Sequence, residues 1–282
     1  MPQRDTCIVF LTHIWDEVLA RRFERLRRES AAHADCFLVL QEDDPEVVAR
    51  WKAQLESIGA ADALFTFNAL ELPRQLGFRY FGSERIMGNA HFPLLSFLRS
   101  HPGYAYFWQV EGDVEYRGRW GEFFEAYRET DAVLLAAHFH RFQDWPDWFW
   151  WPSLTPPADV QLPRENMYKA FMAVVRFSRA ALESVERAHR QGWLGHFEAI
   201  VPTILLMEGR RLEDLNVRKT CYVGAFQDPV ALLPLQSTVR CRPYVSLQEF
   251  AHRGQGPLLF HPVKERWVFD GEKVMIMPPG GG

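Results

Sequence analysis

The sequence lacks several features that mark whole classes of protein. Its four cysteines (Cys7, Cys36, Cys221 and Cys241) are widely spaced and form no C-x-x-C pair, so neither a zinc site nor a disulfide framework is indicated. No apolar run is long enough to cross a bilayer, and the first residues contain no apolar signal-peptide region. We therefore expect a soluble, cytoplasmic chain with reduced thiols and no transmembrane segment, while peripheral contact with a membrane stays open.

The chain also has no excess of positive charge. The chain has 32 Lys and Arg against 36 Asp and Glu, with a formal net charge of −4. No basic field that would attract nucleic acid is expected. The G-x-G-x-x-G loop, the Walker P-loop, the G-x-S-x-G elbow and the H-E-x-x-H helix are all missing. The corresponding dinucleotide, P-loop, serine-hydrolase and zinc-protease chemistries are therefore not indicated.

What the sequence does contain is an alternation of short β-prone runs and amphipathic stretches. The strands are expected at 7–13, 36–40, 63–67, 104–110, 131–137 and 172–177, and the helices at 14–30, from 45, and at 89–99, 120–128, 178–190 and 195–208. Asp44 is the expected cap of the second helix, and Ser178 that of the fifth. This alternation of strands and helices predicts an α/β fold with a mostly parallel central sheet and helices on both faces.

An acidic triplet, Glu111-Gly112-Asp113, follows the apolar run from 104 to 110. Two carboxylates at the end of a buried strand repel each other unless a cation or protons compensate them. Their oxygens suit Mg²⁺ or Mn²⁺, which also bridge to phosphate oxygens, and Gly112 would let a substrate approach the backbone. The alternative is a solvated turn in which both carboxylates face water.

The order of these features resembles the GT-A class of nucleotide-sugar glycosyltransferases. A strand begins the chain, Gly88-Asn89 starts a helix, an aromatic strand ends in an Asp-x-Asp-like triplet, and Glu198 follows on a later helix. The likeness extends to about residue 208 and recurs at His261, with Glu in place of the first Asp of the triplet. It implies a nucleoside-diphosphate sugar as donor, and Glu111, Asp113 and His261 as ligands of Mn²⁺ or Mg²⁺. Some members of the class use basic side chains instead of a metal.

The resemblance also assigns residues to the donor. Thr12 and His13 would border the nucleoside, and Arg85 and Asn89 would approach the sugar or the diphosphate, as would Lys264 after the apolar run 258–260. Asn89 at a helix start offers backbone amides suited to an anion. The alternatives are a helix cap for Asn89 and solvated surface charges for Arg85 and Lys264.

Glu198 is the candidate catalytic base. It lies in the first turn of an apolar helix, where a carboxylate could take the proton of an attacking hydroxyl. It could instead only complement the helix dipole. His196, two residues earlier, would orient the acceptor or cap the chain entry.

Aromatic residues and histidines are expected to line the acceptor. His138 and His140 alternate with Phe139, so their rings should point the same way in an extended segment. Trp145 and Trp148 lie in a loop at 142–157 and offer faces that stack on sugar rings, or they form a hydrophobic cluster instead.

We predict one catalytic domain with two halves. Residues 1–137 bind the nucleotide, 138–235 bind a carbohydrate or glycoconjugate acceptor, 236–277 fold back as an extension, and 278–282 form a disordered tail. Two other functions stay open. One is a nucleotidyltransferase that acts on a sugar phosphate with the same acidic pair, although Thr12 to Asp16 is a poor match for its Gly-rich and basic loop. The other is a non-catalytic carbohydrate-binding protein.

Overall fold

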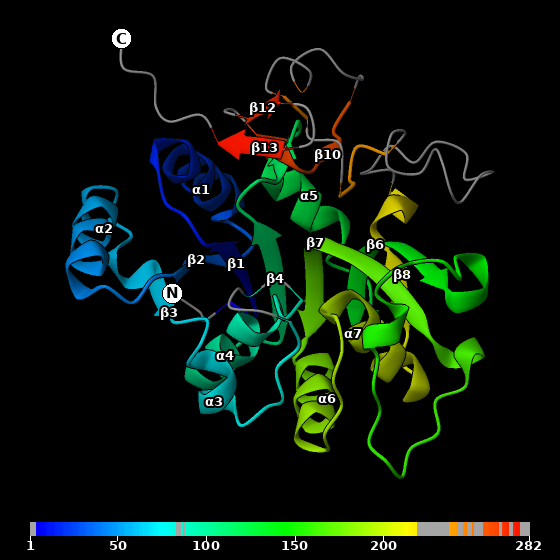
Figure 1. Ribbon diagram of the computed structural model, residues 1–282. Coiled ribbons are helices and arrows are strands. Elements are labelled where there is room, and N and C mark those ends of the chain that lie inside the picture. Colours follow the sequence, from blue (N-terminus) through cyan, green and yellow to red (C-terminus); the bar gives the residue numbers. More distant parts are fainter. Residues whose placement is uncertain are drawn as a thin grey trace.

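A sheet of seven strands, in the order β3-β2-β1-β4-β7-β6-β8, forms the centre of the molecule (Figure 1). The computed structural model describes residues 4–82, 86, 88–218, 237–241, 245–246, 250, 256–264, 267–270 and 273–276. The strands are β1 (Thr6–Thr12), β2 (Asp35–Gln41), β3 (Leu64–Phe67), β4 (Tyr106–Glu111), β6 (Leu134–Arg141), β7 (Tyr168–Ser178) and β8 (Leu212–Asp214). The pairs β1–β2, β1–β4, β2–β3 and β6–β8 are parallel, while β7 runs antiparallel to β4 and β6. The predicted α/β class with a mostly parallel sheet is confirmed.

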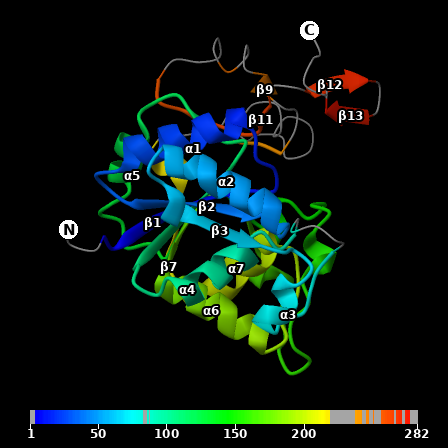
Figure 2. The same cartoon turned by 90° about the vertical axis from the view of Figure 1, so that its left-hand side faces the viewer.

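Helices cover both faces of the sheet, as Figure 2 shows. One face carries α1 (Glu17–Ser30), α2 (Pro45–Ser57) and α5 (Trp120–Ala126), and its core includes Phe23, Leu55 and Phe123. The other carries α3 (Leu72–Leu76), α4 (Phe92–Ser100), α6 (Arg179–Arg190) and α7 (Phe197–Met207). The two cores cover the faces of the sheet. Polar residues gather at one edge of it, at the carboxyl ends of β1 and β4.

Side-chain caps begin several of these helices. The Asp16 carboxylate accepts a hydrogen bond from the Leu19 amide at 2.9 Å, which starts α1 three residues later than expected. Asp44 accepts from the amides of Glu46 and Val47, with Pro45 in the first turn, as predicted. Ser178 caps α6 at the Ala181 amide, also as predicted.

Three expectations about local structure were wrong. A short helix, α3, forms between residues 67 and 89, where no helix was expected, and it ends at Gly77 in the left-handed conformation. Helix α4 begins at Phe92 and not at Asn89, because the Asn89 amide donates instead to the Ile86 carbonyl in a turn. Strand β7 begins at Tyr168, four residues before the apolar run, because β6 continues to Arg141, which pairs with Tyr168.

The C-terminal segment lies beside the loop that follows β4. Strand β10 (Leu259–Phe260) pairs with β5 (Glu115–Tyr116), and β11 (Val263–Lys264) pairs with β9 (Val245–Ser246). Strands β12 (Trp267–Asp270) and β13 (Lys273–Ile276) form a further antiparallel pair, and residues 278–282 lie outside the described residues. In the part of the chain that the structure describes, no helix has the length and apolar character needed to span a membrane.

Candidate functional site

Three predicted ligand residues come together at the carboxyl end of β4. Glu111 is the last residue of the strand, Asp113 lies in the following turn, and His261 comes from the C-terminal segment. The His261 Nε2 atom is 3.3 Å from Glu111 Oε2 and 3.3 Å from Asp113 Oδ1. One ligand atom from each residue lies within 4.8 Å of the others. We call these three residues the acidic trio.

The imidazole of His261 is held in a fixed orientation. Its Nδ1 atom lies 2.8 Å from the carbonyl oxygen of Arg240 and donates to it, while its backbone amide donates to the Thr238 carbonyl at 2.9 Å. Nε2 is therefore the atom presented to the two carboxylates. Such an outer hydrogen bond also sets the tautomer of a histidine that binds a metal.

Charges within the site compensate one another. Although burial opposes the effect, His261 and Lys264 hold the pKa of Asp113 well below its usual value. The Lys264 ammonium forms an ion pair with Asp113 Oδ2. Burial alone would lower the pKa of His261, but Asp113 and Glu111 raise it to about 10. Two carboxylates thus face one imidazolium and one ammonium, which leaves no excess positive charge.

The donor chemistry of the acidic trio fits a divalent cation. Carboxylate oxygens suit Mg²⁺ and Mn²⁺, and imidazole is a common further ligand of transition metals. Binding through His261 Nε2 would require that nitrogen to release its proton. The residues present therefore match the predicted cation site, whose occupancy is a matter for experiment.

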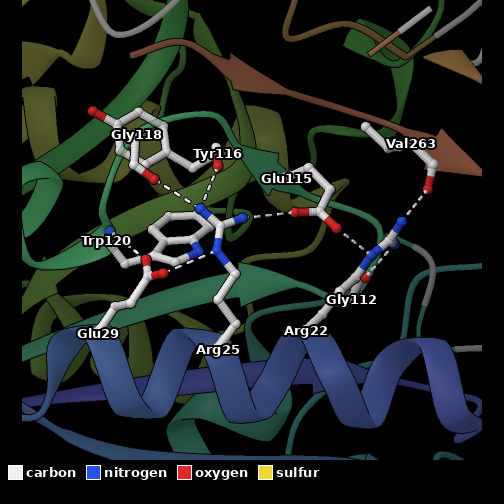
Figure 3. A network of polar contacts seen from close by, with 9 residues as sticks. All are labelled: Arg22, Arg25, Glu29, Gly112, Glu115, Tyr116, Gly118, Trp120 and Val263. Atoms are coloured by element: carbon white, nitrogen blue, oxygen red, sulfur yellow. Dashed lines mark hydrogen bonds and ion pairs between the residues drawn. The ribbon is translucent and has the colours of Figure 1, made fainter. Parts of the chain in front are cut away.

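One buried guanidinium joins the two segments that supply the acidic trio (Figure 3). Arg22 of α1 donates to the Gly112 carbonyl at 3.0 Å and to the Val263 carbonyl at 3.2 Å. Its Nε atom lies 2.7 Å from Glu115 Oε1. The turn after β4 and the returning C-terminal strand are therefore attached to the same side chain.

Arg25, one helical turn further along α1, extends this network (Figure 3). It lies 3.3 Å from Glu115 Oε2 and donates to the Tyr116 and Gly118 carbonyls at 2.8 and 2.7 Å. Sequence reasoning missed both arginines. A signal existed for Arg22, because it follows Leu19 by three residues and so lies on the apolar face of the helix.

Gly112 has a different role from the one expected. A Cβ atom at this position would lie 3.2 Å from Leu19 Cδ2 and 3.2 Å from the Thr12 side chain. The glycine therefore permits close packing against β1 and α1, and the space beside it is filled by protein, not open to substrate. Thr12 itself donates its hydroxyl to the Ile14 carbonyl at 2.7 Å, and His13 is exposed.

Glu198 lies at the start of α7, where the His196 ring accepts a hydrogen bond from its amide at 3.3 Å. Its side chain is only 12% exposed. Burial raises the pKa of Glu198 to about 7; Lys169 and the Met172 amide oppose this rise and Glu111 adds to it. Glu111 and His261 both influence the pKa of this carboxyl, so the carboxyl lies within electrostatic reach of the acidic trio.

Lys169, in β7, was not predicted from the sequence. The residue is 4% exposed. Its ammonium nitrogen lies 4.6 Å from the ring centroid of Trp145 and 5.0 Å from that of Trp148. Burial lowers the pKa of Lys169 to about 8, against the opposing effect of Glu198. The strand was expected to start at Met172, so Lys169 was left outside the sheet.

Rings surround His196, another predicted acceptor residue. Trp150 stacks on the imidazole with centroids 4.7 Å apart and planes at 12°, and Trp148 meets it edge-on at 6.0 Å. Burial lowers the pKa of His196 to about 3, and Lys169 adds to this effect. The ring is therefore neutral, and Trp145, Trp148 and Trp150 form one cluster with it and Lys169, which we call the aromatic cluster.

The expectation that His138 and His140 point the same way was wrong in its premise. Both lie inside β6, but the strand has register shifts here and His138 has a φ of +56°, so regular alternation is broken. His138 Nε2 lies 2.7 Å from the Val239 carbonyl, whereas the His140 ring is 5.8 Å from that of Trp145. His140 thus contacts the aromatic cluster through Trp145.

Asn89 is not an anion-binding helix start. It is buried, its side chain donates to the Phe81 carbonyl, and it precedes α4 by three residues. Helix α4 therefore begins after Asn89, and Asn89 does not supply the amides at its start. Arg85 lies outside the described residues.

Comparisons with known proteins give little direct guidance to function. A family model described as a protein of unknown function (DUF3405) matches residues 74–132, which include the acidic triplet. No curated protein matches the sequence.

Among the solved structures that resemble this chain, two are similar over 75% of it. One is a 4-diphosphocytidyl-2C-methyl-D-erythritol synthase from Anaerococcus prevotii, with 10% identity, a TM-score of 0.39 and 86% of its own chain covered. The other is described as a glucose-1-phosphate thymidylyltransferase from Bacillus anthracis in complex with sucrose, with 9% identity, a TM-score of 0.41 and 85% covered. Likeness at these scores carries no functional argument, so function is argued from the site.

Proposed function

We propose that the protein is a glycosyltransferase. It would move a sugar from a nucleoside-diphosphate sugar to a hydroxyl of a carbohydrate or glycoconjugate. The observation that carries this proposal is the arrangement of the acidic trio opposite a separate buried carboxyl, Glu198, whose pKa of about 7 suits a base at neutral pH.

Charge balance indicates what the donor side requires. Glu111 and Asp113 are matched by the His261 imidazolium and the Lys264 ammonium, so no net positive charge remains for a diphosphate. A divalent cation held by Glu111, Asp113 and His261 would stabilise the negative charge on the departing diphosphate. The ammonium of Lys264 lies beside Asp113 and would contact the same group.

The acceptor side needs one proton acceptor. Glu198 would take the proton of the attacking hydroxyl, and the Met172 and Glu198 amide contacts hold its position. An inverting transfer requires only this one base and no covalent intermediate. The neutral His196 ring and the aromatic cluster would orient the acceptor.

Product analysis tests the reaction type. The full-length protein is incubated with Mn²⁺, a panel of nucleoside-diphosphate sugars and a glycan library, and the phosphorus-containing product is identified by mass spectrometry. Release of a nucleoside diphosphate that depends on a glycan supports the proposal. Pyrophosphate release from a nucleoside triphosphate and a sugar phosphate would instead support a nucleotidyltransferase, and glycan binding without any nucleotide turnover would support a binding protein.

A further inference from the structure

We propose that Lys169, together with Trp145 and Trp148, forms a subsite for an anionic substituent, a carboxylate or a phosphate, on the acceptor sugar. This inference rests on the proposed function for the identity of the bound molecule as an acceptor.

The ammonium of Lys169 is buried, and within the described residues it has no directly paired anion. Lys169 is 4% exposed, and within the described residues no carboxylate forms an ion pair with it and no acceptor forms a hydrogen bond with its Nζ atom. Buried ammonium groups are normally paired, because the loss of hydration is costly. The two indole faces at 4.6 and 5.0 Å offset only part of this cost. An anion that binds here would complete the compensation.

The groups around Lys169 do not compete for that anion. Burial lowers the pKa of His140 to about 4 and that of His196 to about 3, with Lys169 contributing in both cases, so both rings are neutral. Glu198 and Cys241 both act on Lys169 electrostatically and oppose the fall in its pKa, but within the described residues neither forms an ion pair with it. Neutral imidazoles can donate a hydrogen bond to a sugar without adding charge.

The aromatic partners indicate a ring-shaped ligand. Trp145 is half-buried and contacts both Lys169 and His140. Sites for small molecules typically combine aromatic walls with a few placed polar groups. A sugar stacked on Trp145 with its hydroxyl directed to Glu198 would place a charged substituent near Lys169. The subsite would therefore select acidic or phosphorylated sugars over neutral ones.

A competing explanation is that Lys169 only helps Glu198 to ionise. In that case removal of the ammonium would weaken turnover of all acceptors alike. Recognition of an anion instead predicts a change in the ratio between charged and neutral sugars. The ratio is therefore the quantity to measure.

The experiment compares three probes, methyl glucoside, methyl glucuronide and methyl glucoside 6-phosphate, for binding to the full chain by calorimetry and saturation-transfer NMR. We expect at least one charged probe to bind about tenfold more tightly than the neutral probe, because a hydrogen bond to a charged group is worth more than a neutral one. The carboxylate and phosphate arms show which anion is preferred. In Lys169→Met this preference should fall below about twofold, whereas Lys52→Met, an exposed lysine on α2, should retain it.

Equal binding of the neutral and charged probes to the unaltered protein, or no binding of either charged probe, would overturn the proposal without any variant. Persistence of the preference in Lys169→Met would overturn it as well. Lys169→Gln serves as a second variant if Lys169→Met does not fold. The probes require no nucleotide, so a failure here is distinct from a failure of the donor to bind or react.

Discussion

The two sides of the site treat charge in opposite ways. On the donor side, Glu111 and Asp113 form direct ion pairs with His261 and Lys264, and Arg22 fastens both segments. On the side proposed to bind the acceptor, Glu198 and Lys169 influence each other's pKa without forming an ion pair, and Lys169 contacts the ring of Trp145. Pairing shifts the pKa values of Asp113 and His261 toward their charged forms, whereas burial shifts those of Glu198 and Lys169 toward their neutral forms. Under the proposed function, the paired side would position the donor and Glu198 on the other side would take the proton.

The largest effect should come from the base. Glu198→Gln keeps the size and the amide contacts of the side chain but cannot accept the proton, so kcat/KM for transfer should fall about a hundredfold or more. Glu129→Gln, at an exposed position, should leave activity unchanged. Full activity of Glu198→Gln, with its thermal stability intact, would show that Glu198 is not the base.

Arg22→Met should disturb the donor side. It removes the contacts to Gly112 and Val263 and part of the compensation of Glu115. We expect Mn²⁺ affinity to fall by about tenfold or more, as for other outer-sphere contacts, and the free energy of unfolding to fall by about 3 kcal/mol. Arg21→Met is the matched control, because that neighbouring side chain is 65% exposed. Calorimetry and urea denaturation that failed to separate the two variants would contradict this role.

The pH dependence of transfer should report Glu198. Because the base must be ionised, kcat/KM should rise with pH through a midpoint near 7 and fall about tenfold per unit below it. Lys169 opposes the rise in this pKa, so Lys169→Met should move the midpoint upward. A profile that is flat from pH 5 to 8, or a midpoint that moves downward in the variant, would contradict the assignment.

The smallest effect is expected at Gly112. An added methyl group in Gly112→Ala would press on Leu19 and Thr12 from 3.2 Å, which should cost about 1 kcal/mol of unfolding free energy. Urea denaturation measures it. A neutral substitution would show that the turn has space that the packing does not indicate.

Much of the fold could be predicted because its signals are local. Asp44 and Ser178 cap helices as expected, and the β1, β2 and β3 runs lie within a residue or two of their predicted positions. The two carboxylates of the acidic trio could also be anticipated, since Glu111 ends a buried strand and Asp113 follows it, whereas His261 was anticipated only through the resemblance. The role of each trio residue stays a prediction.

The rest depends on contacts between distant segments. Lys169 joins the sheet only because β6 extends far enough to pair with it, through His140. The register shifts in β6 break the alternation of His138 and His140, and the amino-acid sequence gives no sign of them. Arg22 lies on a buried helix face, but its targets at Gly112 and Val263 are 90 and 241 residues away along the chain.

The most direct test of the central claim is cation-dependent binding of the donor product. Nucleoside diphosphates are titrated into the unaltered protein and into Asp113→Asn by calorimetry, with and without Mn²⁺. The account predicts that one nucleoside diphosphate binds the unaltered protein only with Mn²⁺ and that Asp113→Asn abolishes this binding. Binding that is unaffected by Mn²⁺ and by the substitution, or no binding of any nucleoside diphosphate, would contradict it.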